Sequence, residues 1–131
     1  MRILCLFLMT FISLNVFAQS AYSCDFREIC GWNNTTKQIE KCNGIEEAST
    51  FRLDAEETEF KHTTATIETT YKIVSREDCK KGSLKVFAVN SNQGNNYTFI
   101  LDEKQKEIRI LTFTGTVIRF KIVKIEKKKS K

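Results

Sequence analysis

The feature that most constrains the fold is a two-residue alternation of apolar and polar side chains over most of the chain after Thr50. It is clearest in the segments 64–75, 96–101 and 116–125. Alternation with this period, rich in Thr and Ile, is typical of a β-strand that buries one face. The run from Leu84 to Val89 is almost continuously apolar and predicts a strand near the centre of a sheet.

Short polar segments separate these runs and mark turns. The clearest are residues 90–96 (NSNQGNN) and 102–106 (DEKQK), and Gly115 marks another. Strands joined by short turns lie antiparallel to their neighbours in a meander. A single flat sheet of so many strands would leave one face and two edges exposed. We therefore predict an all-β fold, a small antiparallel meander of about seven or eight strands closed into a barrel or barrel-like sandwich.

The first residues have the form of a secretory signal peptide. Arg2 provides a positive start, an apolar run follows from Ile3 to Leu14, and Ala18 ends a plausible cleavage site. The apolar run is shorter than the roughly 20 residues of a membrane-spanning helix. We expect residues 1–18 to be removed and residues 19–131 to form one exported domain, either secreted or periplasmic.

Cleavage would remove Cys5 and leave four of the five cysteines: Cys24, Cys30, Cys42 and Cys79. An even number of cysteines in an exported chain predicts two structural disulfides. Zinc sites require close cysteine pairs or several histidines, and neither is present. A Cys24–Cys30 bridge would need a turn between them, because an extended segment of this length spans about 20 Å. Two other pairings stay open: Cys24–Cys42 with Cys30–Cys79, and Cys24–Cys79 with Cys30–Cys42.

The formal net charge of +5 is concentrated at the C-terminal end. Residues 119–131 hold seven basic side chains against Glu126, so the remainder of the exported domain is mildly acidic. We expect a frayed, solvated end, with weak contact to anionic surfaces as the alternative. A terminal basic run without interleaved aromatic residues argues against nucleic-acid binding.

Candidate catalytic groups are few. His62 is the only histidine, and the nearby carboxylates Asp54, Glu56, Glu57 and Glu59 do not have calcium-loop spacing. A small secreted hydrolase would require His62 and Glu57 or Glu59 to share a cleft. Without a nucleophile motif we predict no enzymatic activity, no metal and no cofactor. Trp32, the only tryptophan, is expected in the core beside a disulfide.

The polar loop between two strong strands is the candidate binding site. Its residues are Asn90, Asn92, Gln93, Asn95 and Asn96. Loops presented by a rigid scaffold often carry recognition, although a plain hairpin turn is the alternative. Asn33, Asn34 and Asn96 each begin an N-x-Thr pattern, which would accept glycans only in a eukaryotic secretory route.

These observations favour an exported, non-enzymatic protein-interaction or inhibitor-type module. This hypothesis predicts a packed interior and a projecting loop. The alternative is a small carrier of an apolar ligand, which predicts a cavity of at least a few hundred Å³.

Overall fold

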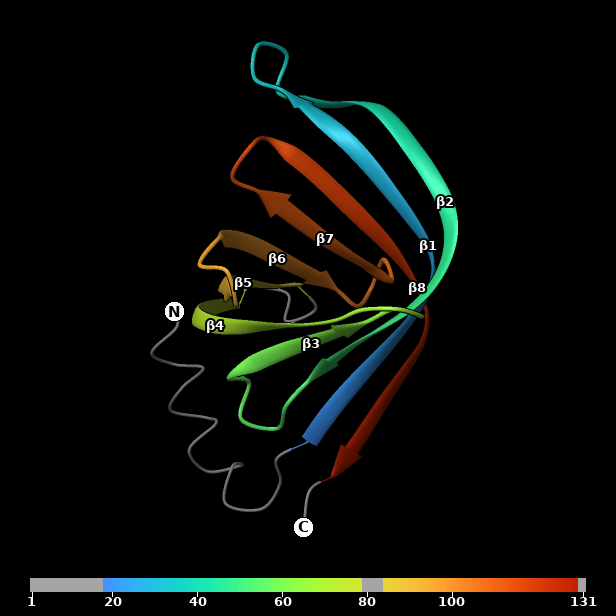
Figure 1. Ribbon diagram of the computed structural model, residues 1–131, viewed down its shortest axis with the longest axis vertical. Coiled ribbons are helices and arrows are strands. Elements are labelled where there is room, and N and C mark those ends of the chain that lie inside the picture. The colour runs from blue at the N-terminus through green and yellow to red at the C-terminus, as the bar shows by residue number, and fades with distance from the viewer. Residues whose placement is uncertain (1–17, 79–83, 130–131) are drawn as a thin grey trace.

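The computed structural model describes residues 18–78 and 84–129, and every element in these ranges is a β-strand (Figure 1). In chain order the strands are β1 (Ala18–Asn33), β2 (Gln38–Leu53), β3 (Glu59–Thr63), β4 (Glu68–Asp78), β5 (Leu84–Ser91), β6 (Asn96–Asp102), β7 (Glu107–Thr112) and β8 (Thr116–Lys129). The proposed signal peptide and Cys79 lie outside the described residues.

The eight strands form a closed antiparallel barrel in which each strand pairs with the next and β8 returns to pair with β1. The predicted all-β meander is therefore confirmed. The N-terminal part, which shows little alternation, forms the two longest strands, β1 and β2. The basic C-terminal segment also differs from expectation, because β8 pairs with β1 as far as Lys129 instead of fraying.

The barrel interior is filled by inward-facing apolar side chains. The buried cluster comprises Tyr22, Cys24, Phe51, Leu53, Phe60, Phe87, Val89, Phe99, Leu101, Ile108, Ile110, Phe120 and Ile122. Phe60 contacts both Phe87 and Phe99 with ring centroids 5.0 Å apart, and Phe51 lies 4.9 Å from Phe120. Aromatic rings at these separations are in direct contact, so side chains occupy the space in which a barrel carrier would hold a ligand.

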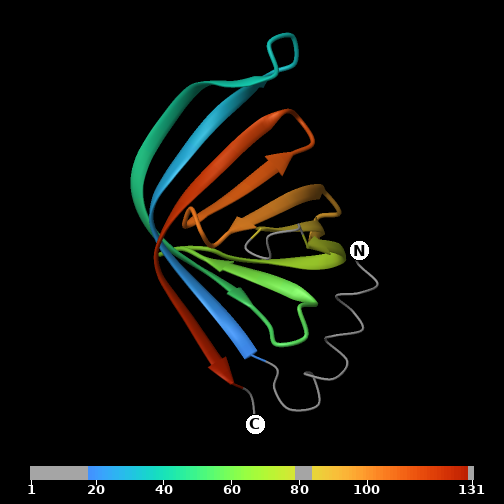
Figure 2. The ribbon, with the colours of Figure 1, turned by 180° about the vertical axis from the view of Figure 1, so that it is seen from behind.

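One hairpin extends past the body of the barrel. β2 pairs with β3 only over Thr50–Leu53, whereas it pairs with β1 from its first residue. We call the segment from Phe26 to Glu46 the arm. Its tip projects beyond the other turns in both views (Figures 1 and 2). Within the arm, β2 therefore has β1 as a neighbour on one edge and no paired strand on the other.

Candidate functional site

The loop predicted to bind a partner is a tight hairpin turn. β5 ends at Ser91 and β6 begins at Asn96. The Ser91 N–H donates to the Asn95 carbonyl over 2.9 Å, and the Gly94 N–H donates to the Ser91 carbonyl over 2.9 Å. Gly94 has a φ of 84°, a left-handed conformation that favours glycine. The backbone of the turn is thus fixed, the Asn92, Gln93 and Asn96 side chains on it are exposed, and a binding role for them stays a prediction.

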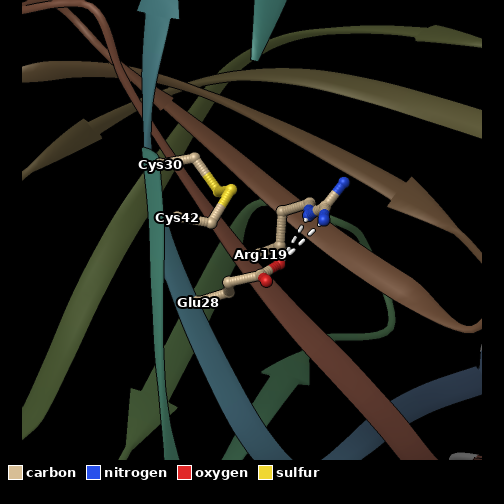
Figure 3. The surroundings of a disulfide bond; sticks show 4 residues. All are labelled: Glu28, Cys30, Cys42 and Arg119. Atoms are coloured by element: carbon tan, nitrogen blue, oxygen red, sulfur yellow. Dashed lines mark hydrogen bonds and ion pairs between the residues drawn. A yellow bond between two sulfur atoms is a disulfide. The ribbon is translucent and has the colours of Figure 1, made fainter. Parts of the chain in front are cut away.

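The structure contains a disulfide between Cys30 of β1 and Cys42 of β2, which links the two strands of the arm (Figure 3). This bond excludes the pairing that joins Cys24 to Cys42. Cys24 lies inside the barrel and is not bonded to any other described cysteine, and burial and the nearby Asp25 charge raise the pKa of its thiol to about 12. A Cys24–Cys79 bridge stays a prediction, because Cys79 is outside the described residues.

Arg119 of β8 supports the bridged region from the neighbouring strand (Figure 3). Its Nε and Nη2 donate to Glu28 Oε1 over 3.1 and 2.7 Å. Among the described residues, the one group close enough to hold a metal ion is Glu28 with Cys30 and Cys42. Since the two sulfur atoms are bonded to each other and Glu28 is paired with Arg119, this group acts as a staple.

His62 lies inside the barrel, away from the acidic turn. Its ring stacks on Phe51 with centroids 4.0 Å apart and planes 7° apart. Burial, followed by the Arg27 charge, lowers the pKa of His62 to about 4. Glu57 lies beyond the opposite end of β3, where it pairs with Arg76 and Lys85. His62 and Glu57 therefore do not share a cleft, and Glu59 lies on the opposite face of β3 from His62 because the two are three positions apart in the strand.

We call the end of the barrel at which the described chain starts and finishes the terminal end. Charged side chains pair with one another there. The Tyr22 hydroxyl donates to Glu103 Oε2 over 2.8 Å, and Lys127 Nζ lies 3.1 Å from the same carboxylate. Burial raises the pKa of Glu103, but the Tyr22 and Lys127 hydrogen bonds outweigh it and lower the pKa overall. Nearby, Glu57 bridges Lys85 and Arg76. This end is held by paired charges.

The tip of the arm has a different chemistry. We define the arm tip as residues 32–39. Trp32 is 40% exposed and lies opposite Ile39 on the outer face of the hairpin. The prediction that Trp32 belongs to the core is wrong, because no further strand covers this part of β1 and β2. A large aromatic side chain is thus left half in solvent on a projecting element.

Hydrogen bonds fix the shape of the arm tip. Asn33 Oδ1 accepts from the N–H groups of Thr35 and Thr36 over 2.8 and 3.1 Å, and Asn33 Nδ2 donates to Glu40 Oε1 over 3.1 Å. The Lys37 N–H donates to the Asn33 carbonyl over 2.8 Å. An asparagine that binds the following backbone in this way stabilises a turn. Of the two adjacent glycan-acceptor patterns, only the Asn34 side chain is exposed in the turn.

Close packing stiffens the arm below its tip. A Cβ placed on Gly44 would lie 2.3 Å from Cζ of Phe26, so the Phe26 ring rests directly on the glycine backbone. The free edge of β2 in this region carries the charged residues Glu40, Lys41, Glu46 and Glu47, and its register shifts twice. Charges and irregularities of this kind discourage the addition of another strand. Recognition by the arm would therefore use side chains at its tip.

The arm was not predicted from the sequence. Its signals were present: the Asn-Asn-Thr-Thr turn, the neighbouring tryptophan and the two flanking cysteines. Whether β1 and β2 project as an arm depends on the length of β3, and β3 is too short to pair with the outer half of β2. The length of a neighbouring strand cannot be read from the alternation within β2 itself.

In the described part of the chain, no helix is long and apolar enough to cross a membrane. Any functional assignment rests on the geometry described above. No protein-family model, curated protein or solved structure matches the chain.

Proposed function

We propose that the protein is an exported, non-enzymatic interaction module of the inhibitor type, which contacts a partner protein through the arm tip. The observation that carries this proposal is the half-exposed Trp32 on a braced hairpin that projects from a filled barrel. An inhibitor-type contact requires a projecting element that keeps its shape when it enters a cleft. The arm has both properties.

Rigidity favours binding because a rigid element loses less conformational entropy when it is immobilised. The Cys30–Cys42 bridge ties the two strands together immediately below the tip, and the Asn33 side chain holds the turn. The bridge also suits an oxidising, extracellular or periplasmic compartment, in agreement with the expected signal peptide.

The composition of the tip resembles the composition of strong contact sites. Tryptophan is enriched among the few residues that dominate the energy of protein interfaces, and such residues are surrounded by a polar rim. Trp32 and Ile39 supply apolar area, and exposed Asn34, Thr35 and Thr36 surround them with hydrogen-bonding groups. The tip therefore offers an anchor with a polar surround.

The filled interior weighs against the carrier hypothesis. Phe51, Phe87 and Phe99 are completely buried in the barrel interior. A carrier would need to replace such contacts with its ligand, which would cost several kcal/mol for each large side chain displaced. An interaction module needs only a stable scaffold, and these side chains provide it.

Site-specific photo-crosslinking tests the proposal. A photo-crosslinking amino acid is placed at Asn34 in the arm tip and, as a matched control, at exposed Lys61 on β3. Irradiation in the exported fraction of the native host should give one discrete adduct from position 34 and none from position 61. The purified adduct partner should then bind the protein directly, and Trp32→Ser should weaken that binding at least about 30-fold. Equal adducts at both positions, or binding unaffected by Trp32→Ser, would contradict the proposal.

A further inference from the structure

The basic C-terminal segment is divided between two sides of the sheet because it forms part of β8. Lys127 points to the terminal end of the barrel, where it is paired with a carboxylate. Lys128 points to the outside, since successive residues of a strand face opposite sides of the sheet. Lys124 also points outward, because its partner on β1, Ser23, lies between two inward-facing residues. Part of the basic run is therefore displayed on the outer surface of the barrel.

Two further cations reach the same surface from strands that are distant in the sequence. Arg52 of β2 lies between the buried Phe51 and Leu53, so its side chain points outward. Lys61 of β3 is directly opposite Arg52 in the register of the sheet, and both side chains are exposed. Like charges in this position destabilise a sheet. The fold thus keeps two cations together at a cost in stability, which a bound anion would offset.

We define the basic face as the outward side chains of residues 19–23, 50–52, 59–63 and 124–128. Its charged members are Arg52, Lys61, Lys124 and Lys128 with Glu59 and Glu126. Lys124 Nζ lies 3.3 Å from Glu126, and Glu59 lies opposite Lys72 of β4. Within the part of the chain that the structure describes, the other three cations have no carboxylate within 4.0 Å. The basic face therefore carries positive charge that the protein itself does not neutralise.

A hollow of about 120 Å³ lies on the basic face. Its lining consists of Gln19, Ser20, Ala21, Arg52, Glu126 and Lys128. Since β1 lies between β2 and β8, Arg52 and Lys128 flank Gln19. A guanidinium, an ammonium and an amide offer N–H donors that suit the oxygens of a phosphate group. The hollow is equivalent to about four water volumes, which is room for one such group.

The distribution of these cations favours a membrane surface over a linear polyanion. They come from β2, β3 and β8, so they form a two-dimensional patch, whereas a linear polymer contacts a narrow track. Val123 of β8 is 56% exposed beside Lys124. The interface of a bilayer accepts an apolar side chain next to long basic ones, and its anionic headgroups attract the charges. A polyanion would match only the charges.

From these observations we infer that the basic face docks on a membrane that contains anionic phospholipid, with a headgroup phosphate in the hollow between Arg52 and Lys128. The contact is peripheral and held by charge. The arm projects from the opposite end of the molecule, so docking leaves the arm tip free (Figure 1). This inference does not rest on the proposed function, because no residue of the arm takes part in it.

Vesicle co-sedimentation of the exported protein tests the inference. The protein should bind vesicles of phosphatidylcholine with about 30% phosphatidylglycerol, and it should not bind phosphatidylcholine alone. Raising the salt concentration from about 50 to 500 mM should release it by screening. Arg52→Gln and Lys128→Gln, both at exposed positions, should each lower the partition coefficient about 5-fold, and about 30-fold together. Lys37→Gln removes the same charge from the arm tip and should change it less than about 1.5-fold.

Equal binding to both kinds of vesicle, or to neither, would overturn the inference. So would a loss with Lys37→Gln as large as with Arg52→Gln, because binding would then follow net charge and not the basic face. Binding to dextran sulfate without binding to anionic vesicles would also overturn it. Trp32→Ser should still bind vesicles, so failure of the arm proposal is distinguishable from failure of this one. Since the contact is with lipid, it adds no protein adduct at position 61.

Discussion

The two ends of the barrel carry different kinds of side chain: paired charges at one end and exposed apolar residues at the other. At the terminal end, Glu103 accepts a hydrogen bond from Tyr22 and pairs with Lys127, and Glu57 pairs with both Arg76 and Lys85. At the opposite end, Ile67 and Phe113 lie largely in solvent on two turns, and Trp32 at the end of β1 is 40% exposed. Pairing the charges stabilises the fold, whereas exposing large apolar side chains does not. The proposed function assigns a role to one of these side chains, Trp32, as the contact residue of the arm tip.

The largest expected effect tests the core that both ends share. Phe51 is fully buried and its ring contacts His62, Phe99 and Phe120. Phe51→Ala should lower the free energy of unfolding by about 3–5 kcal/mol, the usual cost of a cavity of this size. Urea denaturation measures it, with Phe113→Ala as the exposed control expected within about 0.5 kcal/mol of wild type. Similar losses for both variants would show that the interior is not the stabilising core.

The next effect is a pH dependence that arises inside the barrel, below the arm. The pKa of His62 is about 4 in the folded protein, below the value of about 6.5 for an unfolded chain. Between pH 6.5 and pH 4 the unfolded chain therefore binds the proton more readily, and stability falls as the pH falls. The loss should reach up to about 3 kcal/mol at pH 4.

Replacing His62 isolates this contribution, because the chain has no other histidine. His62 Nε2 is buried without a hydrogen-bond partner among the described residues, so His62→Phe should stabilise the protein slightly at pH 7. The variant should also lose most of the decline between pH 6.5 and pH 4.5 in urea denaturation. An unchanged decline would mean that carboxylates, and not this ring, are responsible.

A smaller loss of stability is expected when the disulfide of the arm is removed. Replacing Cys30 and Cys42 together by serine should lower stability by about 2 kcal/mol, since the bridge closes a short loop. Hydrogen exchange should accelerate at residues 28–44 and stay unchanged at β5 and β6. Uniform acceleration over the chain would show that the bridge stabilises the whole fold and not the arm alone.

The smallest effect probes the terminal end. Tyr22→Phe removes the hydrogen bond to Glu103 but leaves the Lys127 pair, so it should cost about 1 kcal/mol. Tyr97→Phe is the matched change nearer the arm end, and among the described residues its hydroxyl has no bond to a charged group. It should cost less than about 0.5 kcal/mol in thermal or urea unfolding. An inverse order would contradict the contrast between the two ends.

Alternation made the body of the barrel predictable. The segments around Tyr71, Phe99 and Phe120 place apolar residues at every second position, and Tyr71, Phe99 and Phe120 do pack in the interior. The expected strand over 64–75 begins only at Glu68, because residues 64–67 form the β3–β4 turn, where Ile67 is 62% exposed. One bridge of the structure, Cys30–Cys42, also appears among the pairings that spacing left open. Local periodicity is informative wherever a strand has one covered and one uncovered face.

The arm was not predictable by the same reasoning. Lys37 and Lys41 adopt positive φ values of 60° and 55° without being glycines, and the register between β1 and β2 shifts near Cys24 and Cys30. These local irregularities are set by the tertiary pairing. Whether Trp32 is buried depends on which strands extend over it, and a single strand pattern does not contain that information.

Equilibrium binding between the protein and the purified partner of the Asn34 crosslink tests the central claim most directly. Trp32→Ser should leave unfolding within about 0.5 kcal/mol of wild type and yet weaken binding at least about 30-fold. The matched substitution Val123→Ser, at an exposed apolar position of β8 away from the arm tip, should leave binding unchanged. Full affinity in the Trp32→Ser variant, or an equal loss in the Val123→Ser variant, would contradict recognition by the arm tip.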